Sequence, residues 1–275
     1  MYGQKYSNLK KLVLYAIVFT YLVFVLFPLI WLVQSSFKSM YQALKIPPAL
    51  IWSPTFEAYQ KALGGGMLKA FLNSAIVSLS NVVLVLVLGV SAGYALANLK
   101  TKVSQNVGFW ILSVRMAPAF GIIVPLYIIL RSLHLVDTIF AVMVAHLTIN
   151  LPLAIWLLKG YFEEIPSELA EAAIVDGATR TQILLYVLVP VAVPMIVAVS
   201  ALVFLLSWNE FLFAFVLTSE AARTVPVLVA SLAGTMRFDW PLMCALSTLA
   251  LIPAFVLVVY LQRYIVRGLT FGAVK

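Results

Sequence analysis

Residues 184–206 read LLYVLVPVAVPMIVAVSALVFLL, a run without a single charged side chain. A helix needs about 20 apolar residues to cross the hydrocarbon core of a bilayer, so this run predicts a membrane-spanning helix. The two prolines inside it do not exclude a helix, because neighbouring helices can bond the carbonyl groups that proline leaves free. The stretch therefore places the chain among helical membrane proteins.

The rest of the chain has the same character. Of its 275 residues 64% are apolar and 10% are charged, and the mean hydropathy is +1.07, whereas soluble domains are about half apolar and a quarter charged. Similar apolar runs predict six spans: Leu12–Gln34, Phe71–Ala97, Val107–Leu130, Thr138–Lys159, Leu184–Leu206 and Trp240–Gln262. We expect an all-α membrane protein with about six transmembrane helices.

The distribution of basic residues predicts the orientation of these spans. An even number of spans puts both ends of the chain on one side of the membrane. With that side as the cytoplasm, ten Lys and Arg residues lie inside and seven outside, with Arg115 within a span, which favours cytoplasmic N and C termini. The expected plan is a cytoplasmic N-terminus (1–11), a transmembrane domain (12–262) with a cytoplasmic loop at about 160–183, and a cytoplasmic tail (263–275).

Several classes of function find no support in the sequence. The net charge of +8 comes from Lys and Arg scattered singly or in pairs, without the basic stripe that nucleic acid requires. Cys244 has no partner for a disulfide. The chain has no G-x-x-x-x-G-K-[ST] sequence, so ATP must bind on another subunit. It also lacks HExxH, a Cys/His cluster and a nucleophile triad, which weakens a membrane enzyme or assembly scaffold.

The loop after the fourth predicted span carries five of the ten acidic residues, in the stretch EEIPSELAEAAIVDGA at residues 163–178: Glu163, Glu164, Glu168, Glu171 and Asp176. Pro166 suits the first turn of a short helix, acids favour its N-terminal end, and Gly177 supplies the stop. Leu169, Ala172 and Ala173 share one stripe of this helix, and Glu168 and Glu171 share another. We predict that the helix docks onto a soluble partner and meets basic residues there.

Within this loop, Glu171-Ala172-Ala173, Gly177 and Pro190 resemble the cytoplasmic EAA motif of ABC importer permeases. Val187 and Val189 stand where the motif often has Ile and Leu, a conservative departure. In that family the loop forms a coupling helix that sits in a groove of the ATP-binding subunit. The resemblance implies these coupling residues, together with basic residues of the tail: Glu168, Glu171, Ala172, Ala173, Asp176, Gly177, Ala178, Arg263 and Arg267.

Two further stretches are similar to carbohydrate-importer permeases: WNEF at 208–211 and the C-terminal QRYIVRGLTFGAVK at 262–275. The size and this tail resemble the smaller permease subunit of maltose-type systems over essentially the whole chain. The resemblance implies the type I ABC importer permease fold, located in a bacterial or archaeal cytoplasmic membrane. It implies as partners a second, different permease, two ATP-binding subunits that carry ATP and Mg, and an extracytoplasmic solute-binding protein. No cofactor is expected in this chain.

Polar residues at membrane depth predict where the transported solute passes. Ionisable side chains in a span face the bundle interior or a water-filled path by default. Arg115 lies about eight residues into the third predicted span, roughly 12 Å deep, where lining the path and pairing with another residue both remain open. His146 is more typical of helix packing than of proton relay. The candidate path residues are Trp208, Asn209, Glu210, Asn150, Asn73 and Arg115.

The first three of these path residues combine an aromatic face with polar groups, the pairing that binds sugars, although Trp208 equally suits an interfacial anchor. The expected function is half of the translocation path for a sugar or oligosaccharide, working by alternating access. One alternative is the same importer fold carrying another solute, such as phosphate or an amino acid. A secondary transporter would need carboxylates within the spans and inverted repeats, and neither is evident.

Overall fold

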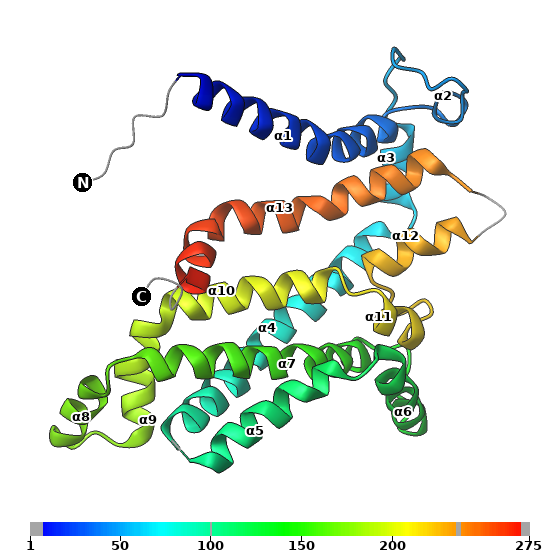
Figure 1. The fold of residues 1–275 in the computed structure, drawn as a ribbon. Coiled ribbons are helices and arrows are strands. Elements are labelled where there is room, and N and C mark those ends of the chain that lie inside the picture. Colours follow the sequence, from blue (N-terminus) through cyan, green and yellow to red (C-terminus); the bar gives the residue numbers. More distant parts are fainter. Residues whose placement is uncertain (1–7, 100, 235–237, 271–275) are drawn as a thin grey trace. The chain divides into compact units, whose positions relative to one another are not determined.

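The structure, a computed structural model, describes residues 8–99, 101–234 and 238–270. These residues form helices and no strand (Figure 1). The helices are α1 (Asn8–Ser36), α2 (Met40–Ala43), α3 (Glu57–Gly64), α4 (Met67–Asn98), α5 (Lys102–Ser113), η1 (Val114–Met116), α6 (Ala119–Ser132), α7 (Ile139–Glu164), α8 (Ser167–Val175), α9 (Arg180–Gln182), η2 (Ile183–Leu188), α10 (Val189–Trp208), α11 (Leu212–Leu217), α12 (Val225–Ala233) and α13 (Trp240–Thr270).

Among the described residues, five helical stretches are long and apolar enough to cross a membrane: Lys10–Ser36, Met67–Asn98, Ile139–Glu164, Arg180–Trp208 and Trp240–Arg263. A sixth is obtained if the bent pair Asn106–Met116 and Ala119–Ser132 counts as one span. Each predicted span coincides with one of these stretches or with the bent pair, to within one residue at Thr138, so the prediction of about six transmembrane helices is confirmed. Most of the helices extend a few residues beyond the predicted bounds.

The third predicted span, Val107–Leu130, is wrong as a continuous helix. Its two halves meet at an angle of 89°. Ala117 has φ −65° and ψ 138°, because the residue before a proline avoids the helical region. Pro118 itself also has an extended backbone, with φ −61° and ψ 136°. Pro125 lies inside α6 without ending it. The tolerance for proline that we expected of membrane helices therefore does not extend to Pro118.

The chain divides into two compact units, residues 1–67 with 229–251 and residues 68–228 with 252–275. In the first unit, every side chain of α1 between residues 11 and 30 is exposed. A helix that is apolar all round is buried by lipid or by other protein surfaces. The α1 surface is therefore suited to a hydrophobic environment from outside the chain.

In the second unit, α4 and α7 pack closely through small residues. A Cβ added at Gly93 would lie 3.0 Å from the Cβ of Leu158 and 3.1 Å from the backbone nitrogen of Lys159. Gly89, one turn earlier, faces Leu158 at 3.5 Å. Small residues spaced by four let membrane helices approach each other closely. This seam belongs to the core cluster that also includes Leu188 at the start of the next span.

The fifth span begins with a π-helical turn, η2. The N–H of Val189 bonds the carbonyl of Leu184, five residues earlier. Pro190 and Pro194 follow at once, and each lacks an N–H for the carbonyl four residues before it. Widening of the turn at this point is consistent with that missing donor, and single π turns of this kind often occur at functional sites.

The expected boundary between the last span and the tail, at residue 263, does not coincide with a change in structure. Helix α13 continues through it to Thr270. Gly268 is therefore helical. Gly272 and Lys275 lie outside the described residues.

Candidate functional site

The site begins where α7 ends and α8 starts. Ile165 has φ −71° and ψ 130°, and Pro166 has φ −55° and ψ 129°. Proline forces the preceding residue out of the helical region, so α7 stops at Glu164. Pro166 occupies the N-cap position rather than the first turn that we predicted. The chain thus turns sharply and restarts as a separate short helix.

Helix α8 ends in a Schellman motif centred on Gly177. The N–H of Ala178 bonds the carbonyl of Ala173 at 2.9 Å, and the N–H of Gly177 bonds that of Ile174 at 3.0 Å. Gly177 has φ +82°, and a Cβ at this position would meet nothing within 4 Å. The requirement for glycine therefore comes from the left-handed backbone rather than from lack of space.

The two sides of α8 have different surroundings. Ala170 and Ala173 pack against the core cluster of the second unit, together with Ala178. The predicted docking stripe of Leu169, Ala172 and Ala173 is therefore divided, because Ala173 points into its own protein while the other two are exposed. The outer side carries apolar residues that our prediction missed, above all Val175, which is 87% exposed. Ile174 is exposed as well.

All the acidic residues of this loop are exposed. Glu163 pairs with Lys159, one turn earlier on α7, at 2.7 Å. Glu168, Glu171 and Asp176 form no ion pair with any of the described residues. The exposed surface of α8 thus carries carboxylates without an ion-pair partner among the described residues, beside the exposed apolar side chains of Ile174 and Val175.

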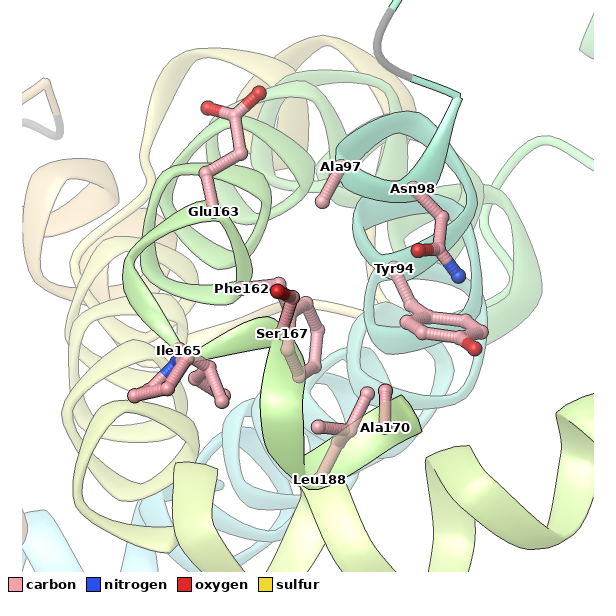
Figure 2. Close-up of a pocket in the computed structure, with 10 residues that line it drawn as sticks. Tyr94, Ala97, Asn98, Phe162, Glu163, Ile165, Ser167, Ala170 and Leu188 are labelled. Atoms are coloured by element: carbon pink, nitrogen blue, oxygen red, sulfur yellow. The ribbon is translucent and has the colours of Figure 1, made fainter. Parts of the chain in front are cut away.

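A cavity of about 260 Å³ lies beside the N-terminal end of α8. Figure 2 shows Tyr94 and Asn98 of α4 on one side of it and Glu163 and Ile165 of the α7–α8 junction on the other. Ser167 stands between them. The lining combines hydroxyl, amide and carboxylate groups with apolar carbon. The recess is therefore able to receive one polar side chain next to the exposed surface of α8.

The basic residues assigned to coupling lie on α13. Arg263 is exposed. The backbone of Arg267 belongs to the same helix, and its side chain is outside what the structure describes.

At the other end of the fifth span, the three residues of the WNE segment have separate surroundings. Trp208 is buried and packs against Phe71 and Phe204, at centroid distances of 5.2 and 5.6 Å. Asn209 is exposed, and its amide donates to the carbonyl of Leu205 at 2.8 Å. Trp208 therefore presents no open face to a solute in this conformation, whereas Asn209 is accessible.

Glu210 binds inward rather than outward. One carboxylate oxygen lies 3.1 Å from Nε2 of His146, whose Nδ1 lies 2.7 Å from the hydroxyl of Ser207. The same carboxylate accepts the N–H groups of Phe213 and Ala214, at 2.9 and 3.1 Å. His146 thus links α7 to the end of α10, as the helix-packing interpretation predicts, and Glu210 caps α11.

The two asparagines assigned to the path are both buried and bonded within the chain. Asn150 donates to the side-chain oxygen of Asn81 at 3.0 Å, which joins α7 to α4. Asn73 donates to the carbonyls of Ala221 and Arg223, at 3.1 and 2.9 Å. Direct contact of either amide with a solute would require the helices to part.

Arg115 lies near the C-terminal end of Asn106–Met116, the first half of the bent pair. It sits on η1, immediately before the bend at Pro118, and is partly exposed. It forms no ion pair with another described residue. The carbonyl ends and the charge at this break are consistent with a polar environment.

Our sequence interpretation missed a second cluster, centred on Asp137. Its carboxylate accepts four backbone N–H groups from residues 219–222 and the hydroxyl of Ser219, at 2.7–3.3 Å. Partial burial by itself raises the pKa of Asp137, but these N–H donors outweigh it, so its pKa lies below the ordinary value. Ser74 of α4 accepts the N–H of Val225 nearby, at 2.9 Å. We call this set of hydrogen bonds the Asp137 clamp. In the sequence, Asp137 is a single acidic residue before Thr138, and no local pattern predicts its contacts with residues 219–222.

In the described part of the chain, no group of three His, Cys, Asp or Glu residues is arranged to hold a metal ion.

Comparison with known proteins places these features in context. Residues 65–271 match the family described as "Binding-protein-dependent transport system inner membrane component". The chain is 36% identical to the trehalose transport system permease SugB of Mycobacterium tuberculosis, over 92% of this chain and 93% of that one. It is 32% identical to the trehalose/maltose transport system permease MalG of Thermococcus litoralis, over 97% and 98%.

Among solved structures, the chain resembles one from a bacterial ABC transporter that imports the acidic polysaccharide alginate. The TM-score is 0.79, at 22% sequence identity and with 95% of this chain and 99% of the other covered. A likeness at this identity concerns the fold. The bend in the third span and the separate helix α8 are therefore found in a chain whose fold matches that of an importer subunit.

Proposed function

The chain belongs to the family of binding-protein-dependent transport system inner membrane components, and from this premise we propose that it carries a sugar and is coupled to its ATPase through α8. As an ABC importer permease it is a multi-pass membrane subunit and not an enzyme, since the ATPase resides in a separate subunit. A permease of this class works with a second permease, an ATPase and a solute-binding protein. We infer a heteromeric permease pair with two ATPase subunits, with the chain's ends in the cytoplasm.

The surface of α8 is the observation that carries the coupling role. Val175 and Ile174 expose apolar side chains beside the unpaired carboxylates of Glu168 and Glu171. A loop that only needs solubility has no reason to expose such a patch. A partner groove with apolar walls and basic residues complements it, and the recess beside Ser167 accommodates one further polar side chain. We propose that the ATP-binding subunit supplies this groove.

We propose a secondary coupling role for the basic residues of α13. Arg263 is exposed on a helix that continues beyond the predicted end of the last span. An exposed cation there suits an acidic patch on the same ATPase. We therefore keep Arg263 and Arg267 as secondary contacts.

The proposed substrate is a sugar or oligosaccharide. It is supported by relatives named for trehalose, for trehalose and maltose, and for diacetylchitobiose, at 31–36% identity over more than nine-tenths of this chain. Identification of the solute that copurifies with the partner solute-binding protein tests this assignment. Retention of an amino acid or inorganic phosphate in place of a carbohydrate would contradict it.

For the path, we propose Asn209 as the direct contact of the WNE segment. Trp208 and Glu210 would support Asn209 without contacting the solute. Trp208 packs against two aromatic rings, and Glu210 accepts an N–H group at the start of α11. Asn73 and Asn150 would hold the walls of the path, and Arg115 would face water at the bend. Alanine at Asn209 should alter solute uptake without loss of protein, whereas alanine at Trp208 should lower both.

The coupling role is tested by reconstituted transport with Glu171→Ala and Gly177→Val. Glu171 is exposed and unpaired, so its loss should change stability by only about 0.5 kcal/mol. Valine at residue 177 strains the left-handed backbone and should misplace the end of α8. We expect uptake and substrate-stimulated ATP hydrolysis to fall together while the protein still inserts.

The matched control for that experiment is Glu220→Ala, an exposed acid on the loop after α11. It should transport normally. Normal uptake by both α8 variants would contradict the coupling role, and a loss of uptake that only tracks membrane abundance would reduce it to a structural one.

A further inference from the structure

The segment between α1 and α3, residues 37–56, forms a closed loop. The N–H of Thr55 donates to the carbonyl of Phe37 at 2.8 Å, so the two ends of the loop meet. The ring of Phe56 packs edge-on against that of Phe37, at a centroid distance of 5.5 Å. In Figure 1 the loop, which contains α2, stands to one side of the C-terminal end of α1. Its conformation is thus tied to the end of the first span.

Lys38 holds the interior of this loop. Its side chain is 3% exposed, and its ammonium group donates to the carbonyl of Ala49 at 2.9 Å. The same group lies 4.8 Å from the ring centre of Trp31 on α1 and 4.6 Å from that of Trp52 in the loop. Cation–π contacts of this kind attract strongly when water is excluded. The ring of Trp52 is therefore turned inward, where it helps to hold the loop.

The outer surface of the loop is apolar and well exposed. Ile46 is 93% exposed and Ile51 is 96% exposed, and Leu50 lies beside them. The whole segment 37–56 contains no acidic residue, and its exposed charge is that of Lys45. Large apolar side chains gathered on a surface are unusual for a face in contact with water alone.

We propose that the tip of this loop inserts into the headgroup layer of the membrane beside the first span, as an interfacial anchor. Two observations favour lipid over a protein partner. The loop begins at the residue where the span Lys10–Ser36 ends, so it starts at the bilayer surface. Its exposed side chains are mainly aliphatic and aromatic, with one lysine and no acid, and apolar side chains of this kind are buried when a segment lies in the interface. Lys38 keeps the tip in shape for this contact.

The experiment places a polarity-sensitive fluorophore on Ile46→Cys or Ile51→Cys, each with Cys244→Ala to leave one thiol. The full permease is reconstituted in vesicles of equal parts phosphatidylglycerol and phosphatidylethanolamine, with bromine on the upper part of the acyl chain. Residues this exposed lose little packing when changed, so the variants should fold. Glu220→Cys, an exposed position on another loop, is the matched control.

We expect both loop labels to shift to the blue and to be quenched by brominated lipid at least about twofold more than the control, because interfacial segments lie about 5–10 Å below the surface. Labels at 46 and 51 that are quenched by aqueous iodide as readily as the control would overturn the proposal. Protection that arises only when the purified solute-binding protein is added would also overturn it, in favour of protein docking.

Discussion

The two ends of α7 are held in different ways. At its N-terminal end, the carboxylate of Asp137 binds the 219–222 loop through backbone N–H groups, and α4 adds hydrogen bonds from Asn73. At its C-terminal end, α8 is attached by small apolar residues such as Ala170 and Ala173 and by the turn at Gly177. No side-chain hydrogen bond ties α8 to another helix among the described residues.

One end of α7 is completed by contacts within the chain, and the other is built to meet another protein. The clamped end uses its polar groups within the chain. The α8 end leaves carboxylates and apolar side chains such as Val175 exposed. A rigid helix clamped at one end and presenting a docking surface at the other is suited to pass a displacement from that surface into the membrane.

The largest effect on stability should come from the seam between α4 and α7 near the α8 end. Gly93→Val places a branched side chain within about 3 Å of the backbone at Leu158 and Lys159, and overpacking of this kind costs about 1–3 kcal/mol or more. We expect a marked loss of thermal stability in detergent. The control is Gly160→Ala on α7, where nothing lies within 4 Å and alanine should stabilise the helix by up to about 1 kcal/mol. Equal melting temperatures for the two variants would disprove the close contact.

The clamped end should be the next most sensitive. Asp137→Asn removes the charge to which four backbone N–H groups donate, and hydrogen bonds to charged groups contribute about 1.5–3 kcal/mol. We expect a loss of about 2 kcal/mol, measured by thermal or denaturant unfolding. Glu220→Gln, with an exposed side chain in the same loop, should stay within about 0.5 kcal/mol of the parent. A neutral Asp137→Asn would show that the clamp is dispensable.

A smaller effect should follow acidification. The pKa of Asp137 lies below its ordinary value in the folded protein, so the unfolded chain takes up the proton first as pH falls. The stabilisation is therefore complete above the ordinary carboxyl pKa and is lost as pH falls towards the lower folded value. The gap in melting temperature between the parent and Asp137→Asn should narrow between pH 7 and pH 3. A gap that stays constant would mean that the charge of Asp137 does not stabilise the fold.

The same contrast explains what the sequence was able to predict. Local sequence patterns predict the five continuous spans and the short helix α8. Hydropathy predicts the spans, and Pro166 and Gly177 determine where α8 begins and ends, because each affects the backbone of adjacent residues. The side of α8 that faces outward depends on what lies beneath Ala173, which no local pattern contains. The link from His146 to Glu210 and the Asp137 clamp join residues more than 60 positions apart. The bend at Pro118 was missed because proline is usually tolerated in membrane helices.

The smallest effect on stability should come from the outer side of α8. Leu169→Ser with Val175→Ser changes exposed side chains and should shift unfolding by no more than about 0.5 kcal/mol per residue. Uptake by the reconstituted importer should nevertheless fall, because the proposed partner loses its apolar contact. Ala173→Leu is the matched change on the inner side, and it should lower stability as well. If the outer double variant transported normally, the exposed patch would have no coupling role.

The most direct test of the account is a photo-crosslink from α8 in the assembled, purified importer. A benzophenone is attached at Val175→Cys or, as a control at the clamped end, at Glu220→Cys, each with Cys244→Ala. We expect the label at residue 175 to form an adduct with the ATP-binding subunit, identified by mass spectrometry, and the label at residue 220 to form none. An ATPase adduct from both positions, or from neither, would contradict it.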